Sequence, residues 1–100
     1  MVWFFKRSSG KSAKVARKET YEYAQDFCAS RTDVEAYFEA ETPREPASIM
    51  LVAHDGEWTR RKVPSLADAA KLSAELGIPL YEVARTGYPR SVREWNARHK

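Results

Sequence analysis

The sequence predicts an α+β fold: a single domain in which helices pack on a small, mainly antiparallel sheet, in the order α-β-β-β-α-β-α. Three observations support this fold class. A β-hairpin signal spans residues 49–63, a helix with start and stop signals spans residues 65–77, and apolar and acidic side chains alternate over residues 34–41. At 100 residues, 43% hydrophobic and 31% charged, the chain has the size and composition of one globular domain.

The beginning of the chain is expected to form an arm that precedes a domain of residues 13–100. Residues 1–12 join an apolar start to several cations and a Ser-Ser-Gly segment, which is typical of a flexible basic and aromatic arm. The sequence leaves three alternatives for the apolar residues at the start: packing against the domain, contact with a membrane interface, or disorder. These residues are Val2, Trp3, Phe4 and Phe5.

Residues 13–30 have the periodicity of an amphipathic helix, with Ser12 available as its N-cap. Its apolar face is expected to include Tyr23 and Phe27, with Cys28 beside them. The cations of this helix come early and its acids late, which opposes the helix dipole, so packing must supply its stability.

Residues 34–41 are predicted to form a strand with one buried and one acidic face. Val34, Ala36 and Phe38 occupy alternate positions, as a strand requires. A helix is the alternative, because alanine and glutamate favour helices. The loop that follows contains Pro43 and Pro46.

The hairpin of residues 49–63 is predicted to turn at Asp55-Gly56, in a type I′ turn with positive φ at both residues. Its first arm is almost entirely apolar, which predicts a central strand that is covered on both faces. Its second arm ends in Arg60, Arg61 and Lys62, which suits an edge strand that resists further pairing.

The last third of the chain is expected to hold a helix, a strand and a second helix. Ser65 is a predicted N-cap with Asp68 in capping-box position, and Gly77 is a predicted left-handed stop. Residues 78–84 indicate a strand, residues 85–90 a loop, and residues 91–98 a short final helix.

The charge of the chain is modest in total and uneven in layout. The net charge is +3, with basic residues near both ends and acidic residues over positions 21–46. The layout fits either ordinary solvated faces or a basic surface that meets phosphate or an acidic partner. The single cysteine, the absence of an apolar run of membrane-spanning length and the absence of a signal peptide predict a cytoplasmic protein.

Catalytic and cofactor motifs are missing from the sequence. No metal-ligand spacing and no nucleotide-binding glycine motif occurs, so we expect no metal, no cofactor and no enzymatic activity. The remaining catalytic hypothesis is a small enzyme in which His54 activates Cys28, which would require the fold to bring the two together. Cys28 lies on the apolar side of its predicted helix, where cysteine is usually inert.

Binding is the function class that the sequence favours. Aromatic residues interleaved with arginines are types found at protein-interaction hot spots, and they also suit base stacking and phosphate contact. We therefore predict a non-catalytic, monomeric module that binds a protein partner, with RNA or ribosome association through the same surface as the alternative. The predicted contact residues are Trp58, Arg60, Arg61, Tyr88, Arg90 and Arg93.

Four short motifs also suggest a family. They are Gly56-Glu57-Trp58-Thr59-Arg60-Arg61, Gly77-Ile78-Pro79-Leu80-Tyr81, Gly87-Tyr88-Pro89 and Trp95-Asn96-Ala97-Arg98. Over residues 30–100 the chain resembles a family of small, largely uncharacterised actinobacterial proteins. The resemblance implies a cytoplasmic bacterial protein and names no chemistry.

Overall fold

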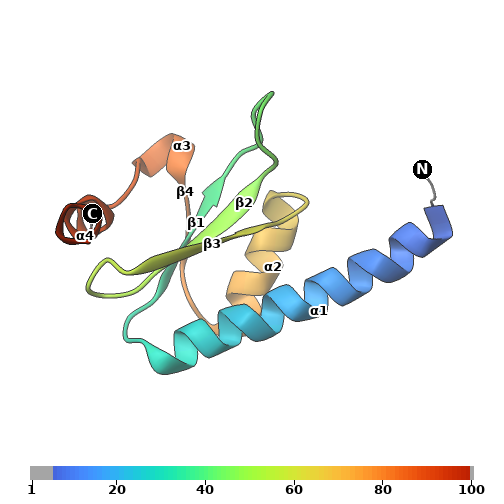
Figure 1. Ribbon diagram of the computed structural model, residues 1–100, viewed down its shortest axis with the longest axis horizontal. Helices are drawn as coiled ribbons and strands as arrows, with labels where there is room; N and C mark the ends of the chain where they lie inside the picture. The colour runs from blue at the N-terminus through green and yellow to red at the C-terminus, as the bar shows by residue number, and fades with distance from the viewer. Residues whose placement is uncertain (1–5, 100) are drawn as a thin grey trace.

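The computed structural model describes residues 6–99, with side chains from Lys18 onward, and shows a small α+β domain (Figure 1). The predicted fold class is confirmed, and one additional short helix, α3, follows the last strand. The expectations for Val2, Trp3, Phe4 and Phe5 concern residues outside the described part of the chain. The elements are α1 (Lys6–Ser30), β1 (Glu35–Glu39), β2 (Ser48–Val52), β3 (Trp58–Lys62), α2 (Leu66–Leu76), β4 (Leu80–Glu82), α3 (Val83–Thr86) and α4 (Arg90–Arg98).

The four strands form one mixed sheet in the order β3-β2-β1-β4. The pairs β1–β2 and β2–β3 are antiparallel, with Met50 opposite both Tyr37 and Arg60, whereas β4 lies parallel to β1. Residues 35–39 are therefore a strand and not the alternative helix. Because β1 is central, Tyr37 is buried as well as Ala36 and Phe38, so the face expected to be acidic is partly apolar.

The structure confirms the two predicted arms of the hairpin but not the predicted type of turn between them. β2 is buried at every position and β3 is an exposed, basic edge, as the sequence predicts. The connection is a longer loop, closed by hydrogen bonds from the Gly56 amide to the Ala53 carbonyl and from the Ala53 amide to the Glu57 carbonyl, at 2.9 and 2.8 Å. Only Gly56 in this loop has positive φ, so the predicted type I′ turn is wrong, and the pattern fits a three-residue loop.

Two apolar clusters cover the two faces of the sheet. On one face, Ala36, Phe38, Ile49 and Leu51 pack against α1 and α2. On the other face, a smaller cluster of Tyr37, Met50 and Val52 is covered by Val92 of α4. Figure 1 shows α1 and α2 on one side of the sheet, with α3 and α4 on the other.

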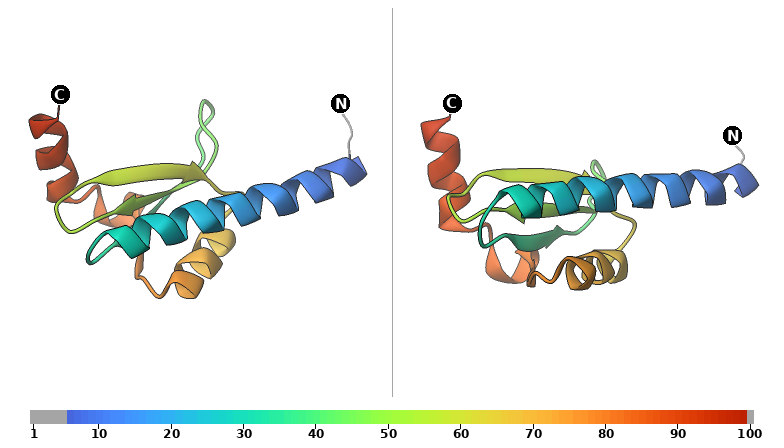
Figure 2. Two further views of the ribbon diagram at one scale, coloured as in Figure 1. Left: turned by 60° about the horizontal axis from the view of Figure 1, so that its bottom comes forward. Right: turned by 90° about the horizontal axis from the view of Figure 1, so that it is seen from below.

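Helix α1 is longer than predicted, and its buried face includes Phe27 and Cys28 as predicted but not Tyr23. It begins at Lys6 and not at residue 13, so Ser12 lies inside it and residues 6–12 are helical. Gly10 lowers the stability of the helix by about 1 kcal/mol relative to alanine. Lengthening a helix that has already formed avoids the unfavourable nucleation step, which offsets this cost. This extension projects beyond the rest of the domain (Figure 2). Tyr21 packs against the core, whereas Tyr23 is exposed.

The caps of α2 match the sequence-based prediction. The Ser65 hydroxyl accepts a hydrogen bond from the Asp68 amide at 3.3 Å, and Gly77 adopts the left-handed conformation with φ 71°. In α2, Leu72 is buried and Leu66 is exposed. The strand predicted over residues 78–84 is shorter, because the chain turns into α3 at Val83.

Helix α4 packs directly on the hairpin loop. A side chain at Gly56 would place its Cβ 2.1 Å from the carbonyl oxygen of Ser91 and 3.1 Å from the Cβ of Trp95. Arg98 donates a hydrogen bond to the carbonyl of Asp55 at 3.1 Å. These contacts hold α4 against the loop between β2 and β3.

Candidate functional site

A carboxylate at the end of β1 organises the predicted contact surface. Glu39 accepts two hydrogen bonds from the guanidinium of Arg60, at 2.6 Å from Nε and 2.9 Å from a terminal nitrogen. The hydroxyl of Ser48 donates a third at 2.8 Å. Alternation along the strands places these three residues on one face of the sheet, with Ser48 beside Glu39 in the register.

Tyr88 completes this arrangement from the loop between α3 and α4. Its hydroxyl donates to the second oxygen of Glu39, while 43% of the residue stays exposed. The preceding Gly87 has a φ of 74°, a conformation that glycine adopts without strain. We call Glu39, Ser48, Arg60 and Tyr88 the Glu39 cluster.

The cluster shifts the pKa values of its members. Burial raises the pKa of Glu39, but the hydrogen bonds from Arg60, Tyr88 and Ser48 outweigh burial and bring the pKa below its ordinary value. The same contacts act on the partners, because the hydrogen bond to Glu39 raises the pKa of both Arg60 and Tyr88. Glu39 is therefore a carboxylate at neutral pH, and the charge of Arg60 is paired with it.

Trp58 extends the surface beyond the Glu39 cluster. Its indole nitrogen donates to the side-chain oxygen of Asn96 on α4 at 2.9 Å, which fixes the ring. The guanidinium carbon of Arg60 lies 5.1 Å from the centre of that ring, within the range of a cation–π contact. Trp58, Arg60 and Tyr88 thus form one surface, in which Asn96 holds Trp58 and Glu39 holds both Arg60 and Tyr88.

The other three predicted residues lie outside the surface formed by Trp58, Arg60 and Tyr88. Arg61 points to the opposite face of the sheet, where its guanidinium carbon stacks 3.6 Å from the ring centre of Tyr23. Arg90 is exposed and faces Glu94 at 3.9 Å, an i,i+4 pair on α4. Arg93 reaches the carbonyl of Tyr88 at 3.5 Å and so borders the Glu39 cluster.

Glu39 and Ser48 are the site residues that the sequence-based reasoning missed. The acidic alternation of β1 placed Glu39 on an exposed face, and nothing nearby in the sequence pointed to a cationic partner. Its partners Arg60 and Tyr88 lie 21 and 49 residues further along the chain. The available signal was the hairpin register, which puts Arg60 on the same face of the sheet as Glu39.

Comparisons with known proteins do not extend this description. No family model, curated protein or solved structure matches the chain. Across residues 6–99 there is no helix both long and apolar enough to cross a membrane. The same described residues contain no group of three or more His, Cys, Asp or Glu side chains arranged to hold a metal ion.

The two residues of the catalytic hypothesis lie in different surroundings. Cys28 packs against the larger core cluster, and burial raises the pKa of its thiol. The side chain of His54 is 77% exposed on the hairpin loop, with Nδ1 3.9 Å from a carboxylate oxygen of Asp33. Burial therefore disfavours the thiolate form of Cys28, which nucleophilic attack would need.

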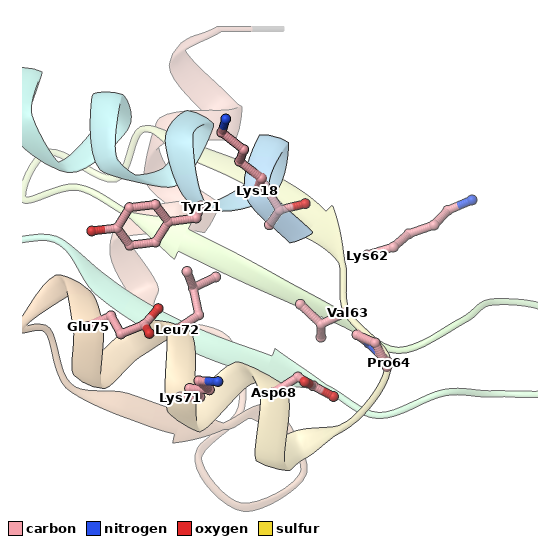
Figure 3. A pocket seen from close by; sticks show the side chains of 10 residues that line it. Lys18, Tyr21, Lys62, Val63, Pro64, Asp68, Lys71, Leu72 and Glu75 are labelled. Atoms are coloured by element: carbon pink, nitrogen blue, oxygen red, sulfur yellow. The ribbon is translucent and has the colours of Figure 1, made fainter. Parts of the chain in front are cut away.

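A second surface feature lies on the opposite side of the sheet, between α1 and α2. It is a groove of about 1050 Å³ that opens where β3 runs into α2 (Figure 3). Tyr21, Val63 and Leu72 supply its apolar lining, and lysines from α1, β3 and α2 border it. The bordering lysines are Lys18, Lys62 and Lys71.

Proposed function

We propose that this chain is a non-catalytic protein-binding module of the bacterial cytoplasm, whose contact surface is formed by Trp58, Arg60 and Tyr88. One observation carries the proposal. Each of the three side chains is exposed in part and is held in place by an internal hydrogen bond, to Asn96 or to Glu39. Rigid aromatic and arginine side chains lose little conformational entropy on binding, which is why they dominate protein interfaces.

The satisfied polar groups favour a protein partner over a nucleic acid. Phosphate binding needs cations whose charge is available, whereas the bidentate contact with Glu39 occupies Arg60. The surface therefore offers ring faces and a flat, neutralised guanidinium, which suit the apolar and polar groups of a protein interface.

Affinity capture with matched variants tests this function. Tagged wild-type protein is expected to retain a partner from a lysate of its native host, and Tyr88→Ala is expected to lower that retention by about thirtyfold, the loss typical of a hot spot. Leu66→Ala is the control, because Leu66 is a similarly exposed hydrophobic residue on α2, at 38% against 43% for Tyr88. Equal retention by all three proteins would overturn the proposed surface.

RNA association through the same surface is the alternative function. Exposed arginines near Tyr88 support it: Arg90 on the first turn of α4 and Arg93 one turn later. Binding through phosphate contacts would weaken steeply between about 50 and 200 mM salt. Binding of an RNA oligonucleotide with that salt dependence, lost on Arg90→Ala together with Arg93→Ala, would favour this alternative.

A further inference from the structure

The strand β3 is the last strand on its side of the sheet, so half of its backbone groups face away from β2 (Figure 1). The bonds that flank the strand show which half. The Glu57 carbonyl accepts from the Ala53 amide at 2.8 Å, and the Val63 amide donates to the Ala47 carbonyl at 3.1 Å. Because the direction alternates along an antiparallel pair, the even-numbered residues point outward. We call their backbone groups the open edge; they belong to Trp58, Arg60 and Lys62.

The side chain of Arg61 covers the middle of the open edge. Its Nη1 donates a hydrogen bond to the carbonyl oxygen of Arg60 at 2.9 Å. Across the residues that the structure describes, no other hydrogen bond reaches the open edge. A strand that paired with β3 would need the same carbonyl as an acceptor, so it would have to compete with the guanidinium of Arg61.

Tyr23 of α1 holds the Arg61 side chain in this position. The guanidinium carbon lies 3.6 Å from the centre of the Tyr23 ring, which is a close cation–π contact. The hydroxyl of Tyr23 is hydrogen-bonded to the hydroxyl of Thr59 at 2.9 Å, so the ring itself is fastened to β3. A guanidinium that is stacked on a fixed ring loses little further freedom when it bonds to a carbonyl, and the contact with Arg60 is therefore more persistent than that of a free surface arginine.

Apart from Arg61, the strand is suited to pairing with a second copy of itself. If two β3 strands met antiparallel across a twofold axis, each Arg60 would lie opposite the other, and each Trp58 opposite a Lys62. Glu39 already neutralises Arg60, and a lysine beside an indole ring is a favourable contact. Arg61 alone opposes this pairing, because it occupies the central carbonyl and would lie diagonally across the axis from the other Arg61.

We propose that Arg61 protects the open edge of β3 against pairing with β3 of a second copy, by holding its guanidinium on the Arg60 carbonyl. The inference assigns to Arg61 the resistance to further pairing that the sequence suggested for all three cations of the strand. It does not depend on the proposed function, since Arg61 lies on the opposite face of the sheet from the surface of Trp58, Arg60 and Tyr88.

Self-association of the complete chain tests the proposal. Amide NMR shifts are followed over a protein concentration of about 0.05 to 2 mM, a range that detects weak association. Arg61→Val is expected to raise the association constant about tenfold over the wild type, with shifts centred on residues 58–62, because the central carbonyl is then free to pair. Sedimentation equilibrium of the same samples is expected to show a dimer.

Lys62→Val is the matched control for the loss of charge. It removes one cation from the same strand and adds the same β-branched side chain, but it leaves the contact between Arg61 and the Arg60 carbonyl intact. Its association constant is expected to stay within about twofold of the wild type, because Lys62 would lie beside the Trp58 ring, where its charge does not oppose pairing.

Variants of Tyr23 separate the carbonyl contact from the charge. Tyr23→Ala leaves every charge of β3 in place and removes the ring that holds the guanidinium, so the association constant is expected to rise about threefold. Tyr23→Phe keeps the ring and loses only the bond to Thr59, and it is expected to lie between the wild type and Tyr23→Ala. Both positions are exposed, and urea unfolding checks that each variant is folded.

The proposal fails if Arg61→Val associates no more strongly than the wild type, or if Lys62→Val associates as strongly as Arg61→Val, which would make net charge the cause. It also fails if Tyr23→Ala behaves as the wild type does, or if the wild type itself forms a tight dimer through residues 58–62. Concentration-dependent shifts centred on Leu72 or Tyr88 would place the self-contact elsewhere and overturn it as well. The Tyr88→Ala capture experiment remains independent of all these outcomes.

Discussion

Glu39 and Arg60 belong to strands that do not touch, and their side chains meet across β2. The pair closes over Ser48, which donates to the same carboxylate at 2.8 Å, and it leaves the Glu39 side chain only 15% exposed. A carboxylate withdrawn this far from water needs its donors, because an unpaired buried charge is costly. The same contacts also hold Tyr88 and Arg60 in place on the surface that we propose for binding.

The pair is expected to contribute measurable stability. Replacing Arg60 and Glu39 by alanine, singly and together, should give a coupling energy of about 1 kcal/mol in urea unfolding, a modest value because Arg60 is 45% exposed. The pair Arg85–Glu82 is the control: its atoms are 3.7 Å apart, Arg85 is 80% exposed, and its coupling should be near zero. Equal coupling in the two cycles would contradict the special position of Glu39.

The lowered pKa of Glu39 predicts a loss of stability in acid. Because the folded-state pKa lies below the ordinary value of 4.5, the folded state favours the carboxylate. The resulting stabilisation is complete above the unfolded-state pKa and is lost as the pH falls through the folded-state value. Unfolding free energies of the wild type and Glu39→Gln, measured from about pH 7 to pH 3, should converge toward low pH. Parallel profiles would show that Glu39 is not the titrating group.

Gly56 is expected to tolerate no side chain. Gly56→Ala would add a positive-φ strain and drive a Cβ into the backbone of Ser91, so we expect a loss of more than about 2 kcal/mol and displacement of α4. Urea unfolding gives the energy, and fluorescence of Trp58 and Trp95 reports the displacement.

Gly77→Ala provides the comparison for Gly56. Gly77 also has positive φ, at 71°, but nothing lies within 4 Å of its added Cβ. Its substitution should therefore cost about 1 kcal/mol from strain alone. Similar losses for the two variants would mean that the contact between the hairpin loop and α4 is not maintained in solution.

The thiol of Cys28 is expected to react slowly in the folded protein. Its partial burial raises its pKa, so little thiolate is present at neutral pH. Alkylation by iodoacetamide should be much slower in buffer than in denaturing urea, where the same thiol is exposed. Reaction at equal rates would revive the catalytic hypothesis of Cys28 with His54.

The parts of this fold that the sequence-based reasoning predicted are those specified by neighbours along the chain. Ser65 and Gly77 bound α2 because capping satisfies backbone groups within a few residues. The apolar run of β2 and the cations of β3 placed these strands at the centre and the edge of the sheet, because burial follows local hydrophobicity. The extension of α1 over residues 6–12 was missed because its Ser-Ser-Gly segment suggested a break.

The candidate site depended on contacts that no local pattern specifies. Glu39 gains its partners from positions 21 and 49 residues away, and Arg61 on β3 stacks on Tyr23 of α1. Sequence alone therefore determined the order of the main helices and strands and the burial of β2, since these follow from local propensity and hydrophobic period. The tertiary structure alone decided which charges pair and which stay available to a partner, because charge pairing is set by distance in space and not by separation in sequence.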